Sequence, residues 1–138
     1  MSRQRQFVIS DLHLGHEKML TFEREEGHLL RPFNSIAEHD GTIIRNWNSV
    51  VTEQDKTYIL GDVVWGKNNI HLLKALKGEK VLIKGNHDNL WNVREFLGVF
   101  SDVHGIKPMN TQWGKCVLSH VPIHTDSIER WGINIHGH

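Results

Sequence analysis

The stretch that decides the fold spans residues 80–88 and reads KVLIKGNHD. Its first half is a short apolar run that fits a buried strand, and its second half is a polar turn that begins with a glycine. Residues 57–60 lead in the same way into Gly61-Asp62, and residues 7–9 lead into Ser10-Asp11. In open α/β sheets, ligands bind beyond the carboxyl ends of the strands. We therefore expect the polar residues after these three runs to form one site.

Helical patterns separate these runs, and the alternation is the signature of an α/β fold. Residues 35–38 read SIAE, a capping-box pattern that predicts the start of a helix. Its apolar positions recur at helical spacing and are Ile36, Ile43, Ile44, Trp47 and Val51. We expect further helices over residues 69–76, before Gly78, and over residues 90–97.

The last third of the chain has a different pattern. Strand-like runs cover residues 103–109, 115–119 and 132–136, and residues 110–114 join the first two as a hairpin turn. We expect this hairpin to belong to a second sheet layer. Because no repeat, low-complexity tract or flexible linker divides the chain, residues 1–138 are expected to form one domain. The predicted architecture is an α/β two-layer β-sandwich flanked by helices.

Composition limits the classes of function. Sixteen basic and sixteen acidic side chains cancel, so no overall field attracts nucleic acid or an anionic membrane. A single cysteine, Cys116, excludes an internal disulfide, and no signal-peptide core or bilayer-spanning run is visible. These features argue against a passive DNA-binding module. They predict a cytoplasmic protein without membrane contact and leave its oligomeric state open.

Histidine and carboxylate residues at the strand ends suit divalent metals, and 11 of the 138 residues are histidine. Asp11-Leu12-His13 places two side chains on the same side of an extended segment, where both could reach one ion. Taken alone, this pair also fits a surface loop with a helix-capping aspartate. Asp62 has two carboxylate oxygens and is the candidate bridge between two metals about 3.5–4 Å apart.

Gly85-Asn86-His87-Asp88 is the most informative motif, because a chance match at this point is on the order of one in a thousand. The glycine permits a tight turn, and the amide oxygen of Asn86 can bind a second metal. His87 is then left to face the substrate, and Asp88 can orient or polarise its imidazole. Further imidazoles end the later strands, although each alone also fits a structural role: His120, His136 and His138.

In order along the chain, these motifs resemble the five-part signature of the calcineurin-like metallophosphoesterases: Asp11-x-His13, Gly61-Asp62, Gly85-Asn86-His87-Asp88, His120 and Gly137-His138. The sequence around them is similar to small phage and bacterial members, notably SDLHLGH at 10–16, RPF at 31–33, WN at 47–48 and NIHGH at 134–138.

The resemblance implies a binuclear centre with the first metal on Asp11, His13 and Asp62, and the second on Asp62, Asn86, His120 and His138. Mixed ligands of this kind suit manganese, iron, zinc, nickel or cobalt. The last motif of the family is Gly-His-x-His, so we expect the domain to be cut inside it and the first site to lack one imidazole. An alternative register uses His136 and His138 as the histidine pair, but Ile135 then replaces the motif glycine.

The function implied is two-metal hydrolysis of a phosphoester, with a phosphodiester favoured over a phosphomonoester. A hydroxide that bridges the metals would attack phosphorus, and His87 would protonate the leaving alkoxide as general acid. The substrate itself is open, with nucleotides among the candidates. His16 and His136 are candidates for supporting a ligand or touching substrate. No role is assigned to the other histidines, which are His28, His39, His71, His104 and His124.

Two alternatives remain at this point. The first is a metal-binding scaffold or degenerate pseudoenzyme of the same fold, which would tolerate His87→Asn. The second is an all-helical HD-type phosphohydrolase, which His39-Asp40 and His87-Asp88 would fit, although the strand-like runs contradict it. No Walker-type nucleotide motif occurs.

Overall fold

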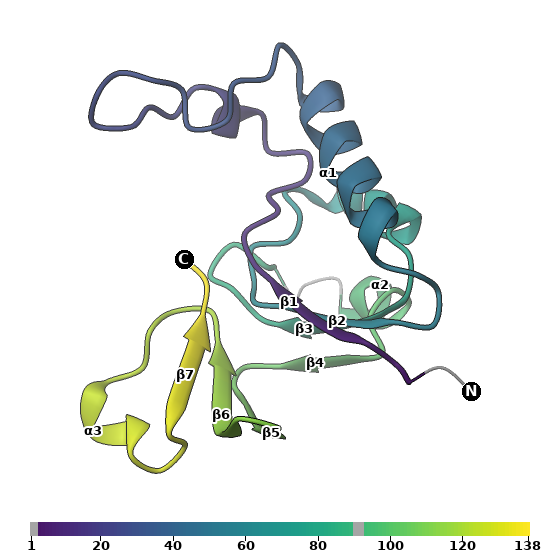
Figure 1. Ribbon diagram of the computed structural model, residues 1–138. Helices are drawn as coiled ribbons and strands as arrows, with labels where there is room; N and C mark the ends of the chain where they lie inside the picture. The colour runs from purple at the N-terminus through teal and green to yellow at the C-terminus, as the bar shows by residue number, and fades with distance from the viewer. Residues whose placement is uncertain (1–2, 90–92) are drawn as a thin grey trace.

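Two sheets form the centre of the molecule, for which a computed structural model describes residues 3–89 and 93–138 (Figure 1). The first sheet has the order β1-β2-β3-β4, with every neighbouring pair parallel. Its strands are Gln6–Ile9, Lys56–Ile59, Glu79–Ile83 and Asp102–His104. In the second sheet β6 lies between β5, which is antiparallel to it, and β7, which is parallel. These strands are Lys107–Thr111, Gly114–Ser119 and Ile133–His136.

The long helix α1, Ile36–Val50, begins at the predicted capping box. The hydroxyl of Ser35 accepts a hydrogen bond from the N–H of Glu38 at 3.1 Å, which satisfies one of the free donors of the first turn. The remaining helical segments are short and are the 3₁₀ helices η1 (Glu17–Leu20) and η2 (Lys67–Ala75), and the α-helices α2 (Val93–Leu97) and α3 (Thr125–Ile128). The expected start of the third helix, at residues 90–92, lies outside the described residues.

Alternating side chains of the first sheet divide the core into two layers. On one face, Ile59 and Leu82 pack with Trp47 of α1 and Leu73 of η2. On the other face, buried residues of both sheets pack together: Tyr58, Leu60, Val81, Ile83, Cys116 and Leu118. Fully burying a side chain such as Leu118 contributes about 1.5–3 kcal/mol. The predicted sandwich with helices on its outer face is therefore confirmed (Figure 1).

The single strand expected over residues 103–109 is wrong, because the chain changes sheets within it. β4 pairs with β3 in the first sheet, whereas β5 pairs with β6 in the second. Gly105 and Ile106 make the crossing between them. The hairpin that follows, β5 to β6, forms as predicted.

The parallel pairing brings the carboxyl ends of β1, β2 and β3 to one edge of the sheet. β6 and β7 run toward the same side, so the C-terminal residue ends near the loop after β1 (Figure 1). Strands directly before the polar motifs exclude the all-helical HD-type alternative. No helix in residues 3–89 or 93–138 has the length and apolar character needed to cross a membrane.

Candidate metal centre

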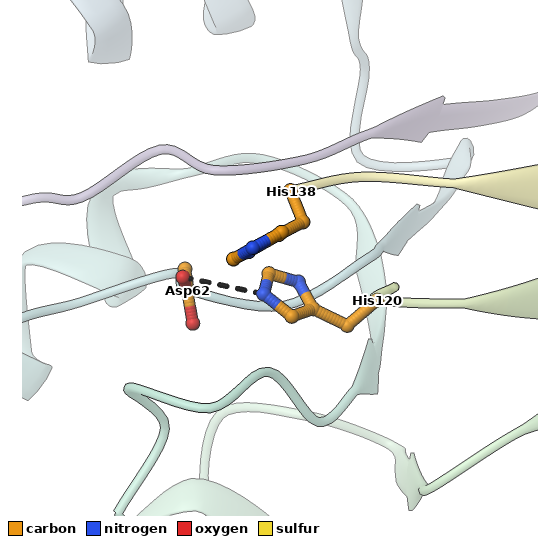
Figure 2. A group of neighbouring side chains, drawn as sticks. All are labelled: Asp62, His120 and His138. Carbon is orange, nitrogen blue, oxygen red and sulfur yellow. Dashed lines mark ion pairs between the residues drawn. The ribbon is translucent and has the colours of Figure 1, made fainter. Parts of the chain in front are cut away.

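Two groups of side chains that could each hold a metal ion meet at this edge and share Asp62. One group is Asp11, His13 and Asp62, and the other is Asp62, His120 and His138. Within each group, one potential ligand atom per residue lies within 4.8 Å of the others. Figure 2 shows the second group, in which both imidazoles extend toward the Asp62 carboxylate. A carboxylate shared by two ligand groups is the arrangement expected of a two-metal site.

Interatomic distances show that Asn86 also belongs to the second group of candidate ligands. In the first group, His13 Nε2 lies 3.6 Å from Asp11 Oδ1 and 3.8 Å from Asp62 Oδ2. In the second, His120 Nε2 lies 3.3 Å from Asp62 Oδ2 and 2.8 Å from Asn86 Oδ1. The structure thus brings together the six residues that the sequence proposed as ligands: Asp11, His13, Asp62, Asn86, His120 and His138.

Hydrogen bonding around His120 tests whether these atoms fit a cation. His120 Nδ1 lies 2.7 Å from the carbonyl oxygen of Leu60, which can only accept, so the ring proton sits on Nδ1. The other ring nitrogen, Nε2, faces oxygens of Asp62 and Asn86, and in a neutral ring it offers them only a lone pair. A cation between converging lone pairs of this kind satisfies all of them at once. The donor set therefore fits a divalent metal ion.

His13 receives a comparable support from His16. Their Nδ1 atoms are 3.2 Å apart, which leaves His13 Nε2 directed at the carboxylates of its group. His16 is buried and stacks on Trp65, with ring centroids 4.1 Å apart and ring planes 6° from parallel. Burial lowers the pKa of both histidines, although the Asp62 carboxylate opposes this for His13. A neutral His13 has a lone pair available for a metal.

Asp11 is held in its charged form by its neighbours. Burial would raise the pKa of this carboxyl group, but hydrogen bonds from the Ser10 hydroxyl and the backbone N–H of His138, together with the nearby His120 and His13, lower it overall. The bond from His138 is 2.8 Å long and ties the end of β7 to the end of β1. An ionised Asp11 is the form that binds a cation.

The sequence suggested that Asp88 orients the imidazole of His87, but its hydrogen bonds in the structure run to backbone N–H groups. Its buried carboxylate accepts hydrogen bonds from three backbone N–H groups, those of Asp62 (2.8 Å), Val63 (3.0 Å) and Gly85 (2.7 Å). Burial raises the pKa of Asp88, and these three hydrogen bonds oppose that change. The side chain therefore joins the loops after β2 and β3 through hydrogen bonds to their backbone N–H groups.

Left-handed backbone occurs at four residues other than glycine in the described parts of the chain, and all four are candidate ligands. Their φ angles are 58° at Asp11, 50° at His13, 51° at Asp62 and 68° at His138. Such conformations are unfavourable for side chains with a Cβ and gather at functional sites. The turns that aim the ligands are thus locally strained.

Gly137 explains the register of the last motif. A Cβ at this position would lie 1.8 Å from Ser10 Oγ and 2.7 Å from Asp11 Oδ2. Only a glycine allows the backbone to approach Asp11 closely enough for the His138 N–H to reach it. This supports the Gly137-His138 register over the one that pairs His136 with His138. His136 itself is exposed, and its Nδ1 lies 2.9 Å from the carbonyl oxygen of Gly137.

His87 follows Asn86 on the loop after β3 and is exposed. Its backbone N–H donates to Asp62 Oδ1 at 2.9 Å, and its ring centroid lies 6.0 Å from that of His13 and 5.2 Å from that of Trp65. The imidazole therefore stands beside the first ligand group on the solvent side, where a substrate can reach it.

Sequence reasoning missed a set of hydrogen bonds behind the first ligand group. The guanidinium of Arg31 donates to the carbonyl oxygens of Asp11 and Leu12, and it contacts His39 Nε2 at 2.9 Å. His39 Nδ1 in turn lies 2.8 Å from Asp40 Oδ1, and both oxygens of Asp40 accept from the N–H of Gly15 at 3.0 Å. The signal available in the sequence was a His-Asp pair inside an otherwise amphipathic helix.

These features define the class of protein. A sequence model of the family described as calcineurin-like phosphoesterase matches residues 5–138, so the chain belongs to that family, whose chemistry is metal-dependent phosphoester hydrolysis. The match confirms the resemblance seen in the five motifs.

The chain is also similar in sequence to two individual proteins. The chain is 33% identical over 145 residues to an uncharacterized protein of Methanocaldococcus jannaschii, MJ1445. The alignment covers 100% of this chain and 70% of that protein. It is 38% identical over 84 residues to the Gene 66 protein of Mycobacterium phage L5, across 57% of the chain and 37% of the phage protein. The predicted likeness to phage proteins is thereby confirmed.

Among solved structures, the fold is similar to a protein of unknown function, AQ665, from Aquifex aeolicus. The TM-score is 0.80 at 25% sequence identity, and the similarity covers 99% of this chain and 79% of the other. This likeness confirms the predicted fold class.

Proposed function

We propose that the protein hydrolyses phosphodiester bonds at a binuclear metal centre, with His87 as the general acid. The observation that carries the proposal is the position of Asp62, whose carboxylate belongs to both ligand groups. Asp11 and His13 would complete the first site, and Asn86, His120 and His138 the second. Two bound divalent ions would supply Lewis acidity toward the phosphoryl oxygens and lower the pKa of a water molecule that acts as nucleophile.

Metal binding, positioning of the loops and proton donation would be carried out by different residues of the chain. His120 and His13 would hold the metals as neutral imidazoles, because Leu60 and His16 occupy their Nδ1 atoms. Asp88 keeps the loops that carry Asp62 and Asn86 together through its hydrogen bonds to Asp62 and Gly85. His87 would donate a proton from its ring to the leaving oxygen and then be reprotonated by solvent, to which it is exposed.

Several finer features belong to the same proposal. Oxygen and nitrogen ligands suit manganese, iron, zinc, nickel or cobalt, and we propose manganese as the first metal to test. Residues 1–138 would act as one phosphoesterase domain, which the apolar layer shared by the two sheets supports. A cytoplasmic location is consistent with the buried free thiol of Cys116. Nucleotides are proposed below as the substrate class.

The test compares two leaving groups in metal-stripped protein titrated with Mn²⁺. Wild-type protein should hydrolyse both bis(p-nitrophenyl) phosphate and a dialkyl-type diester only when Mn²⁺ is present. In His87→Asn, the rate with the alkoxide leaving group should fall by roughly 10²–10⁴-fold, because an alkoxide needs a proton. The nitrophenolate substrate should be much less affected, since that leaving group is stable as an anion.

His28→Asn is the matched control, because His28 is exposed, precedes α1 in the chain and belongs to neither ligand group. It should keep the rates of wild-type protein with both substrates. Binding of Mn²⁺ without turnover of any phosphoester would instead favour the metal-binding scaffold, and equal losses with both leaving groups would remove His87 from the role of general acid.

A further inference from the structure

A pocket of about 330 Å³ adjoins the candidate centre on the side of His87. Its walls include Val64, Trp65, Lys67, Ile70, His87 and Phe96. Val64, Ile70 and Phe96 are buried core residues, whereas Trp65, Lys67 and His87 are exposed. The pocket therefore combines an apolar floor with an accessible aromatic ring and a cation. Its volume lies at the lower end of the range for small-ligand sites.

The position of His87 determines which part of a substrate this pocket would receive. A general acid must lie within hydrogen-bond reach of the oxygen that leaves. Because His87 lines the pocket, the group attached to that oxygen would enter it. The phosphoryl group would remain at the ligand groups around Asp62. The walls of the pocket thus select the leaving group.

Trp65 gives the pocket its chemical preference. Its indole is held in place by stacking on the buried His16, and its centroid lies 5.2 Å from that of His87. An aromatic ring fixed in this way loses little freedom when a second flat ring packs on it, and base–aromatic stacking tolerates every base. Exposed Lys67 adds a positive charge, which favours an anionic substrate.

We propose that this pocket binds the nucleoside part of a nucleotide, which makes nucleoside phosphoesters the substrate class of the enzyme. The inference rests on the proposed function, because His87 assigns the leaving group to the pocket. The base contacts Trp65 and the apolar floor, and the sugar lies between them and the phosphoryl group. A phosphoester with the same sugar but no base lacks these contacts.

The experiment compares the binding of adenosine monophosphate and ribose 5-phosphate to the Mn²⁺-loaded protein by calorimetry. The two ligands carry the same phosphoryl group on the same sugar oxygen and differ in the base. Wild-type protein should bind adenosine monophosphate roughly ten-fold more tightly, as expected for one stacked base. Equal affinities would overturn the proposal without the need for any variant.

Two variants separate stacking from indirect effects. Trp65→Leu should reduce the preference to less than about two-fold, whereas Trp65→Phe should keep most of it because a flat ring remains. If Trp65→Leu weakens both ligands equally and keeps their ratio, Trp65 acts through His16 and the proposal fails.

Turnover distinguishes this failure from failure of the proposed function. Mn²⁺-dependent hydrolysis of bis(p-nitrophenyl) phosphate, with equal affinities for the two calorimetry ligands, would indicate a phosphoesterase without a nucleoside pocket. A base preference in binding that depends on Trp65, with no Mn²⁺-dependent hydrolysis of bis(p-nitrophenyl) phosphate or of either ligand, would support the pocket and contradict the proposed hydrolase function.

Discussion

The carboxylate of Asp88 accepts a hydrogen bond of 2.8 Å from the backbone N–H of Asp62, 26 residues earlier in the chain. The same carboxylate binds the N–H of Gly85, at the start of the loop that carries Asn86 and His87. One side chain thus fixes the distance between the residue shared by both ligand groups and the loop that carries the proposed acid.

Asp88→Asn should destabilise the metal-free protein by about 1–3 kcal/mol. The amide group keeps the shape of the side chain, but its NH₂ faces an N–H donor of Asp62, Val63 or Gly85, which is left buried without a partner. Urea unfolding in the presence of a chelator measures the change. Asp126→Asn is the control, because that side chain is exposed on α3 and should leave stability unchanged. Equal stabilities of the two variants would contradict this account of Asp88.

Arg31→Lys should weaken the first metal site by roughly ten-fold or more while the second site keeps its affinity. A lysine carries one ammonium group and cannot bridge the carbonyl oxygens of Asp11 and Leu12 while also contacting His39. The loop that carries Asp11 and His13 would then lose its fixed geometry. Mn²⁺ titration followed by electron paramagnetic resonance reports the two affinities.

Arg45→Lys provides the matched control for this change, since Arg45 is exposed on α1 and donates a hydrogen bond to the Thr42 hydroxyl. It should bind Mn²⁺ as wild-type protein does. A parallel loss at both sites in Arg31→Lys would mean that Arg31 supports the fold in general rather than the first ligand group.

Asp62→Asn and Asp11→Asn should have different effects on the number of Mn²⁺ ions bound. Because Asp62 belongs to both ligand groups, its replacement should weaken both equivalents, whereas Asp11→Asn should weaken one. Equilibrium dialysis with metal analysis gives the stoichiometry. If both variants lose a single equivalent, Asp62 does not bridge, and the binuclear proposal loses its main support.

Outside the candidate metal centre, the ion pair of Arg5 and Asp55 should make the free energy of unfolding depend on pH. Hydrogen bonds from Arg5, and then from the N–H of Thr52, lower the pKa of Asp55 below its ordinary value of 3.8, although burial opposes this. A carboxyl group with a lowered folded pKa stabilises the fold above its unfolded pKa, and this stabilisation is lost as pH falls through the folded pKa.

In Asp55→Asn, the free energy of unfolding should therefore be lower at neutral pH, and its decline between about pH 5 and pH 2 should be shallower than in wild-type protein. Denaturant unfolding across this range, with a chelator present, provides the measurement. Arg5→Gln should reproduce part of the change, because it removes the hydrogen bond that contributes most to the lowered pKa of Asp55. Parallel curves for wild type and Asp55→Asn would refute the assignment.

Local patterns in the sequence predicted most of the strands, the capped helix and the clustering of the candidate ligands, because each depends on short-range rules. Asp11, Asp62 and Asn86 directly follow apolar runs, and parallel strands must bring such positions to one edge. Ser35 and Glu38 are three residues apart and close their hydrogen bond within one turn of α1.

Features that depend on distant partners could not be predicted in this way. The bonds of Arg31 to Asp11 and Leu12 cross 20 and 19 residues, and those of Asp88 to Asp62 cross 26, so no spacing rule relates them. The transfer of the chain from β4 to β5 is similar, because an apolar run carries no sign of which sheet will pair with it. Such features follow from the tertiary fold alone.

The left-handed backbone at Asp11, His13, Asp62 and His138 places the stability of the fold in conflict with the proposed metal binding. Each of these positions would be more relaxed as glycine, and each such strain is of order 1–3 kcal/mol. A mutant library screened for heat resistance alone should therefore enrich those replacements first and lose metal binding as it gains stability. In this protein, the residues whose backbone conformation lowers stability most are therefore retained only when selection acts on activity as well as on stability.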